Sequence, residues 1–272
     1  QEKVSEENDC NVPWAILLDP TSACNLHCTG CWAAEYGHKL NLDLETIDSI
    51  VKQGKELGTY MYIYTGGEPL VRKKDLIKIC EMNPDCEFLS FTNGTLIDEE
   101  FCQEMLRVKN FVPAISLEGT EATTDGRRGD GVYQKVMHAM ELLKSHGLPF
   151  GVSTCYTSAN VDAVSSEEYF DHLIECGAIL HGSSTICRLE MMQHRSCFLL
   201  LHREEKPMSV SVNTVQQSRC LPWISRMMQS LWEDVLQAAV AICISMQTAI
   251  SIHVCLSIIL IPISARKLCW KH

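Results

Sequence analysis

The first two-thirds of the chain alternate short apolar segments with amphipathic segments. The apolar segments predict five strands, at 14–19, 60–64, 88–91, 111–117 and 150–156. Apolar residues recurring three or four positions apart predict five helices, at 42–57, 73–82, 98–108, 133–146 and 166–176. Regular alternation of this kind is typical of parallel α/β folds. We therefore predict five β/α units, and we expect a sixth strand to begin near residue 179.

Polar motifs follow four of the predicted strands at the point where each strand ends. They lie at 24–32, 65–69, 92–95 and 116–119. In a parallel barrel the carboxyl ends of the strands meet at one rim, and active sites lie there. The sequence therefore predicts that these motifs share one site.

Three cysteines lie at C-x3-C-x2-C spacing directly after the first predicted strand: Cys24, Cys28 and Cys31. Three thiolates can hold three irons of a [4Fe–4S] cluster and leave the fourth iron open to another ligand. A zinc site with His27 as fourth ligand is a second interpretation, and plain buried cysteines are a third.

This pattern resembles the signature of the radical S-adenosylmethionine (radical SAM) enzymes. In that family the cysteines follow strand one, and an aromatic residue often precedes the last of them. Here Gly30 precedes Cys31 and Trp32 follows it. The resemblance implies a partial (β/α)6 TIM-like barrel that holds a [4Fe–4S] cluster and S-adenosylmethionine. It also implies reductive cleavage of that cofactor to a 5′-deoxyadenosyl radical, which abstracts hydrogen during maturation of a peptide, protein or cofactor.

The motif after the second strand, Gly66-Gly67-Glu68-Pro69, reads by itself as an ordinary turn. Within the resemblance it matches the family's second signature, whose acceptors meet the amino group of the cofactor's methionine. Asn93, in a turn after the third strand, is also implied to lie near the cofactor, although an Asx-type turn explains it equally well.

Two further residues match the SPASM-type (MoaA-NifB-PqqE-like) branch of the family. Ser116, in Ser-Leu-Glu-Gly, and Arg128, in Asp-Gly-Arg-Arg-Gly, fit its S-x-D-G and D-x-x-R-G patterns, except that Glu118 stands where Asp is usual. The resemblance implies that Ser116 binds the cofactor and that Arg128 pairs with its carboxylate, which suits a guanidinium fork. Cys155, Tyr156 and Thr157 end the fifth strand and are expected to face the substrate cavity, although a core thiol explains Cys155 at least as well.

The composition changes abruptly near residue 180. Residues 1–178 carry 14 basic and 29 acidic side chains, whereas residues 179–272 carry 9 and 5. The 90 residues after Gly182 contain no Gly and no Tyr. A folded domain of that length without one Gly for its turns is improbable.

A shifted reading frame accounts for this change. When residues 223–271 are back-translated and read one frame over, the allowed text includes CIAGGRSYLHINANGDIDPC, which restores Gly, Asp, Asn and Tyr. That string resembles the start of a SPASM/twitch extension, and one base lost between Ala178 and Leu180 would produce the present chain. We therefore expect a remnant of an upstream segment at 1–12, a radical SAM core at 13–178 and an out-of-frame tail at 179–272. The tail would leave the barrel incomplete at strand six.

Charge and cysteine content bear on partners and compartment. A net charge of −11 disfavours nucleic acid and anionic membranes as partners. The start of the sequence is polar and acidic, so we expect no signal peptide, and 15 cysteines in a chain of 272 residues fit reduced, partly metal-bound thiols in the cytoplasm. A flavodoxin or ferredoxin is the expected electron donor, and a peptide is a candidate substrate. Two rival interpretations are a non-catalytic iron–sulfur or zinc module and a membrane anchor in the uncharged segment 235–265.

Overall fold

The computed structural model describes residues 12–31, 33, 37, 39–185 and 261–262. The strands are β1 (Ala15–Leu18), β2 (Met61–Tyr64), β3 (Glu87–Thr92), β4 (Phe111–Ser116), β5 (Gly151–Tyr156), β6 (Leu180–Thr185) and β7 (Ile261–Pro262). The helices are α2 (Leu44–Glu56), α3 (Lys73–Met82), α4 (Glu99–Val108), α5 (Glu121–Arg128), α6 (Val132–Ser145), α7 (Val161–Val164) and α8 (Glu167–Cys176), and a 3-10 turn, η2, covers Pro69–Arg72.

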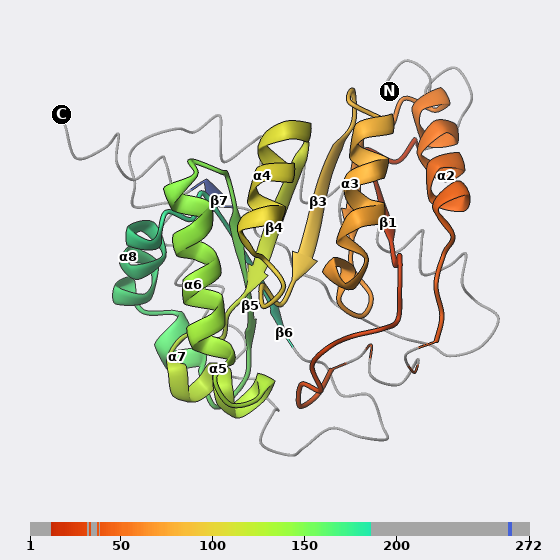
Figure 1. The fold of residues 1–272 in the computed structure, drawn as a ribbon. Helices are drawn as coiled ribbons and strands as arrows, with labels where there is room; N and C mark the ends of the chain where they lie inside the picture. The colour runs from red at the N-terminus through yellow and green to blue at the C-terminus, as the bar shows by residue number, and fades with distance from the viewer. Residues whose placement is uncertain (1–11, 32, 34–36, 38, 186–260, 263–272) are drawn as a thin grey trace.

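The strands form one sheet in chain order, from β1 to β7. Neighbouring strands from β1 to β6 are parallel, and β7 runs antiparallel to β6. Helices α3, α4 and α6 cover one face of this sheet (Figure 1). In the described residues β6 does not pair back to β1, so the sheet is open. The predicted fold class, a partial parallel α/β barrel, is therefore confirmed.

Alternation along the strands separates the apolar side chains into two groups. Side chains such as Tyr62, Phe88 and Ile115 point to the helices and join the main core. A smaller cluster on the opposite face is formed by Ala15, Ile63, Leu89 and Ala114. The side-chain period of two in a strand produces this division.

A sixth strand lies where the α/β alternation predicts it, and Leu180–Thr185 pairs along its whole length with β5, whereas the reading-frame hypothesis predicted that this strand would be lost. The pairing uses backbone groups, which the edge of β5 offers to any extended segment. The segment also supplies His181, which is 3% exposed, lies edge-on to Phe170 and makes a 3.0 Å hydrogen bond with Thr154 Oγ1. Burial lowers the pKa of His181 to about 4, so the imidazole is neutral near pH 7.

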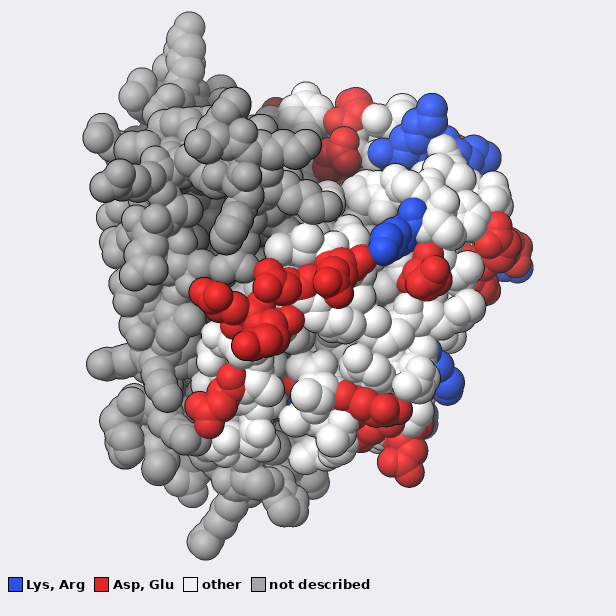
Figure 2. All heavy atoms as spheres, turned by 90° about the vertical axis from the view of Figure 1, so that its left-hand side faces the viewer, with Lys and Arg blue, Asp and Glu red and all other residues white. Residues whose placement is uncertain are grey.

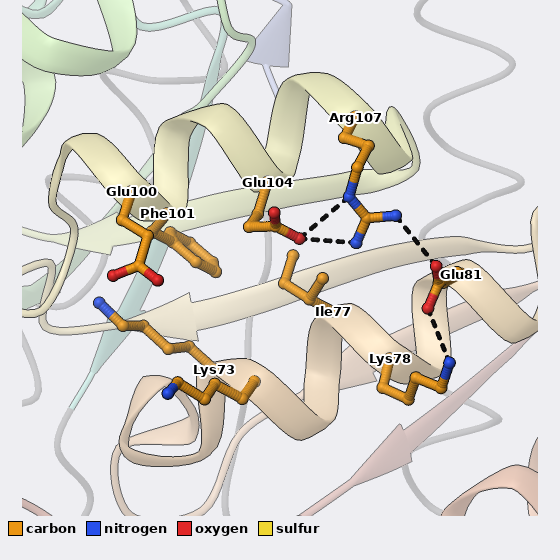
Figure 3. Close-up of a pocket in the computed structure, with 9 residues that line it drawn as sticks. Lys73, Ile77, Lys78, Glu81, Glu100, Phe101, Glu104 and Arg107 are labelled. Carbon is orange, nitrogen blue, oxygen red and sulfur yellow. Dashed lines mark hydrogen bonds and ion pairs between the residues drawn. The ribbon is translucent and has the colours of Figure 1, made fainter.

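The outer helical layer carries surface charge pairs. A groove between α3 and α4 contains ion pairs from Glu81 to Lys78 (2.9 Å) and to Arg107 (3.1 Å), and a third pair joins Arg107 to Glu104 at 2.6 Å (Figure 3). Exposed pairs of this kind contribute little to stability. This groove lies on the helical layer, and none of the predicted site residues lines it.

The side formed by α6, α7 and α8 is rich in acidic side chains (Figure 2). Its exposed members are Glu141, Asp162, Glu167, Glu168, Asp171 and Glu175. In the described part of the chain, no helix is both long and apolar enough to cross a membrane. The segment 235–265, considered above as an anchor, lies outside the described residues.

Candidate functional site

The loop that carries the cysteines is docked on the loop after β2. The Gly67 N–H donates to the Thr21 carbonyl (2.9 Å), and the Glu68 N–H donates to the Ala23 carbonyl (2.8 Å). A Cβ on Gly67 would lie 2.3 Å from the Ala23 oxygen, and a Cβ on Gly66, whose φ is +98°, would lie 2.8 Å from the Thr21 oxygen. Only glycine permits this close approach of two backbones. The two glycines therefore determine where the segment just before Cys24 lies.

Glu68 joins the loops after β2 and β3 inside the protein. Its side chain accepts hydrogen bonds from the Leu70 N–H (2.9 Å), the Thr92 hydroxyl (2.7 Å) and the Asn93 N–H (2.7 Å). The residue is 1% exposed. Burial raises the pKa of the Glu68 carboxyl, and these hydrogen bonds only partly oppose that effect. Glu68 therefore holds two rim loops in register.

Asn25 connects the cysteine loop to the loop after β3. Its Oδ1 accepts a 2.8 Å hydrogen bond from Asn93 Nδ2, and its Nδ2 donates a 2.8 Å hydrogen bond to Thr95 Oγ1. The backbone of Asn93 is in turn bonded to Glu68. Asn93 therefore positions the cysteine loop through its side chain.

Cys24, Cys28 and Cys31 all lie on this loop, and each is half-buried. Burial raises the pKa of the Cys24 thiol, and the nearby Glu68, Cys28 and Cys31 raise it by smaller amounts. Among the described residues, no group of three His, Cys, Asp or Glu side chains is arranged so that it could hold a single metal ion. Three thiols on one anchored loop, with soft sulfur donors, fit a [4Fe–4S] cluster chemically. Trp32 lies outside the described residues.

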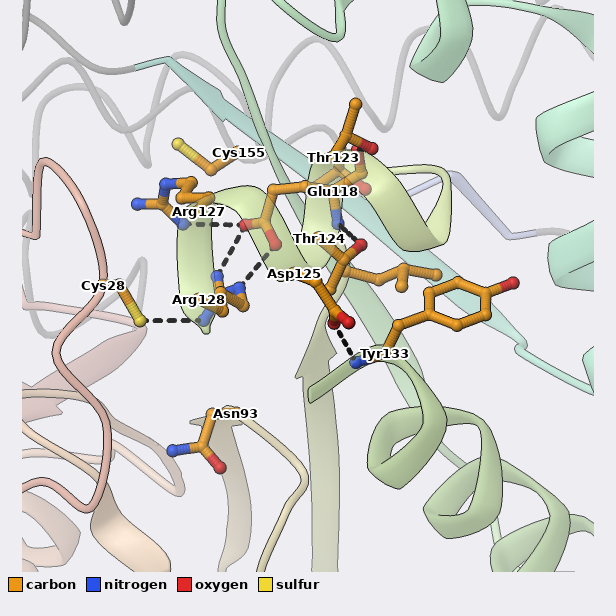
Figure 4. A network of polar contacts seen from close by, with 12 residues as sticks. Cys28, Asn93, Glu118, Thr123, Thr124, Asp125, Arg127, Arg128, Tyr133 and Cys155 are labelled. Carbon is orange, nitrogen blue, oxygen red and sulfur yellow. Dashed lines mark hydrogen bonds and ion pairs between the residues drawn. The ribbon is translucent and has the colours of Figure 1, made fainter. Parts of the chain in front are cut away.

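Beside this loop a buried carboxylate binds two arginines (Figure 4). Glu118 accepts from Arg127 Nη1 at 2.7 Å and from Arg128 through Nε at 2.5 Å and Nη2 at 2.6 Å. The Glu118 side chain is 1% exposed. Burial opposes ionisation of Glu118, but the charges and hydrogen bonds of Arg128 and Arg127 outweigh it and hold its pKa below the ordinary value.

The same arginines contact the cysteine loop. Arg128 Nη1, which is not bonded to Glu118, lies 3.9 Å from Cys28 Sγ, and the Thr29 N–H donates to the Arg127 carbonyl at 2.8 Å. Burial raises the pKa of the Cys28 thiol, whereas the positive charges of Arg128 and Arg127 lower it. Helix α5, which carries both arginines, is held to α6 by Asp125, whose carboxylate accepts from two backbone N–H groups at the start of α6. The sequence patterns implied a cofactor carboxylate for Arg128, and the structure places Glu118 against it.

Two other predicted residues lie on the face of the sheet that carries the small cluster. Ser116 ends β4 and is paired with Ser153 of β5. Cys155, near the end of β5, lies beside Arg127 in Figure 4. Two expectations are wrong: Tyr156 packs in the main core because it alternates to the helix side, and Thr157 is buried with its N–H bonded to Asn160 at 2.6 Å.

Comparison with known proteins decides the family. Residues 18–176 match the Radical SAM superfamily. The chain belongs to this superfamily. The matched segment contains the cysteine loop, the Gly-Gly-Glu-Pro loop and helix α5. Members of the superfamily use a [4Fe–4S] cluster together with S-adenosylmethionine.

Its relatives include maturation and biosynthetic enzymes. An AdoMet-dependent heme synthase of Methanosarcina barkeri is 27% identical over 63% of this chain and 50% of its own length. A serine-type anaerobic sulfatase-maturating enzyme of Klebsiella aerogenes is 28% identical over 61% of this chain and 45% of its own. The chain thus spans about half the length of the curated relatives it matches.

Solved structures agree on the fold. Streptococcus suis SuiB bound to S-adenosylmethionine superposes with a TM-score of 0.67 at 18% identity, over 80% of this chain and 51% of SuiB. The AdoMet-bound enzyme anSMEcpe gives a TM-score of 0.59 at 21% identity, over 72% of this chain and 56% of that protein. At these identities the likeness concerns the fold.

Three residues of the site were not identified from the sequence. Asn25 and Arg127 each adjoin a motif that was recognised, and Thr95 follows the Asn93 turn. The sequence signal for Arg127 is its place beside Arg128, one residue before the end of a helix that apolar periodicity does not predict. No sequence signal marks Asn25, because its partners are 68 and 70 residues away.

Proposed function

We propose that this chain is the core of a radical SAM enzyme in which Cys24, Cys28 and Cys31 ligate a [4Fe–4S] cluster. The observation that carries the proposal is the convergence of two loops and one helix on the cysteine loop. The loop after β2 binds it through Gly67, the loop after β3 through Asn93, and α5 through Arg127. When bound, the cluster and S-adenosylmethionine supply a 5′-deoxyadenosyl radical that abstracts hydrogen.

The chain's own residues would hold the cofactor from several sides. Gly66, Gly67, Glu68 and Pro69 lie in the loop docked just before Cys24, where carbonyl and carboxylate oxygens would be acceptors for an ammonium group of the cofactor. Asn93 keeps that loop attached to the cysteine loop.

The opposite side comes from β4 and α5. Ser116 presents a hydroxyl at the end of β4, and Arg128 presents the Nη1 that faces Cys28, a suitable donor for a carboxylate. Half-burial of the thiols limits access of water to the reacting groups.

The likeness to maturation enzymes supports a substrate class. SuiB has been crystallised with the precursor peptide SuiA. A PqqA peptide cyclase is 25% identical to this chain in an alignment that covers 55% of this chain. We infer that the reaction matures a peptide, protein or cofactor, with an electron donor such as a flavodoxin or ferredoxin.

A separate proposal concerns the part of the chain after Ala178. We infer that 13–178 is the radical SAM core and that 179–272 is translated out of frame. The loss of Gly and Tyr after Gly182 supports this division. The region that would carry a SPASM/twitch extension lies largely outside the described residues.

The test is anaerobic reconstitution of the full chain with iron and sulfide, followed by reduction and incubation with S-adenosylmethionine. We expect absorbance near 400 nm and release of 5′-deoxyadenosine, both lost when Cys24, Cys28 and Cys31 are replaced by Ala. A colourless protein that instead binds zinc through the same cysteines would establish the rival interpretation, a non-catalytic module.

A further inference from the structure

The two arginines of α5 and the carboxylate they share do not balance in charge. Arg127 and Arg128 together carry two positive charges, and Glu118 carries one negative charge. All three side chains are nearly buried, at 15%, 10% and 1% exposed, so solvent screens them weakly. One positive charge therefore remains at this position.

This charge lies against one of the three cluster cysteines. Arg128 Nη1 donates to Cys28 Sγ, and both arginines act electrostatically on that thiol. Arg127 Nε is buried and has no hydrogen-bond partner, so the guanidinium of Arg127 is not fully used in binding Glu118. A group whose role was only to neutralise Glu118 would be redundant, since Arg128 already binds both carboxylate oxygens.

Net charge and hydrogen bonds to the sulfurs are among the factors that set the potential of an iron–sulfur cluster. A fixed positive charge beside a ligating sulfur favours the reduced cluster, because reduction adds one negative charge. We propose that Arg127 raises the reduction potential of the cluster by holding one uncompensated positive charge beside Cys28, and that Glu118 limits that rise. The inference rests on the proposed function, because it needs the cluster to be present.

The test is a potentiometric titration of the reconstituted full chain with dithionite, in which the electron paramagnetic resonance signal of the reduced cluster is followed. Dithionite supplies the single electron that the cluster takes up. In R127Q the equilibrium constant for reduction should fall about tenfold, a shift of about 59 mV to more negative potential. In E118Q, which removes the opposing charge, the potential should shift to more positive values.

Two controls separate charge from packing. R127K keeps the charge, so its reduction potential should lie closer to that of wild type than the potential of R127Q does. R107Q makes the same charge change on the surface of α4, where Arg107 is 47% exposed, and should not shift the potential. Loosened packing alone would move R127Q and E118Q in the same direction, so opposite signs support the proposal.

Equal potentials in wild type, R127Q and E118Q, at full iron content, would overturn the inference and leave the proposed function intact. If one of these variants fails to retain iron, the other still tests the proposal: a shift of the predicted sign supports it, and a shift of the opposite sign overturns it. Failure of the wild-type chain to assemble any cluster would instead overturn the proposed function.

Discussion

Glu68 and Glu118 are both buried carboxylates at the rim of the sheet, yet their pKa values move in opposite directions. Glu68 is bonded to neutral donors, which do not overcome the cost of burial, so its pKa is raised. Glu118 is bonded to two guanidinium groups, whose charges do overcome it, so its pKa is lowered. Charged partners compensate desolvation more effectively than neutral ones.

Because of the Glu118 cluster, the free energy of unfolding depends on pH. A lowered carboxyl pKa contributes stability that is present above the ordinary value of 4.5 and is lost as the pH falls toward the folded-state value. We expect the wild-type chain to exceed E118Q in free energy of unfolding at pH 7, and the difference to shrink below pH 4.5. Urea unfolding at several pH values measures it, and a pH-independent difference would contradict this role for Glu118.

Asn25 offers a test of the cysteine loop alone. N25A removes both hydrogen bonds to the β3 loop, each contributing about 1 kcal/mol in a typical setting, without touching a thiol. We expect the variant to fold normally but to lose iron to a chelator several-fold faster than wild type. N25D keeps the acceptor for Asn93, so its rate of iron loss should lie between those of wild type and N25A. Equal rates of iron loss in all three chains would show that Asn25 does not anchor the loop.

At the scale of elements, the strands and long helices followed from apolar periodicity, because each has one face in the core. The prediction for 73–82 agrees with α3, and that for 166–176 includes Ser166, the N-cap of α8. Helix α5 was not predicted, since it has a single buried residue, Thr124, and contains a glycine. Its helical form depends on the Thr120–Thr123 capping box and on Asp125 bonding to α6, which periodicity does not reveal.

The docking of the cysteine loop on β2 can be tested with glycine substitutions. G67A places a Cβ 2.3 Å from a backbone oxygen of Ala23, so the loop must shift, at a cost of about 1–3 kcal/mol. We expect a lower free energy of unfolding and lower iron content after reconstitution.

The matched control is G126A in α5, where an added Cβ meets nothing within 4 Å. It should leave iron content unchanged and stabilise the chain by about 0.4–1 kcal/mol, as Gly to Ala does in a helix. If G67A reconstitutes as fully as G126A, close approach of the two loops is not required.

For the whole molecule, the sequence predicted the parallel sheet, the shared rim and the family. The alternation of strands and helices predicts a strand near residue 179, and β6 forms there, whereas the reading-frame hypothesis predicts its loss from side-chain composition; strand pairing depends on the backbone. The joint position of Glu118, Arg127 and Arg128 could not be predicted, since it depends on how α5 packs against the cysteine loop.

The reading-frame hypothesis makes a prediction about the encoding DNA. Its codons after Ala178, read one base over, should encode the recovered string, including the segment CIAGGRSYLHINANGDIDPC. Restoring one base there should give a chain that unfolds more cooperatively in a thermal scan. Codons that do not allow that string would refute the hypothesis.

The central claim is that three thiols on one anchored loop hold a cubane with an open iron. The most direct measurement is the electron paramagnetic resonance spectrum of the reconstituted, dithionite-reduced chain, recorded before and after addition of S-adenosylmethionine. We predict about four irons per chain and a signal that changes when S-adenosylmethionine binds the open iron. A complete cluster whose spectrum is unaffected by S-adenosylmethionine, or one that survives replacement of Cys24, Cys28 and Cys31, would contradict the account.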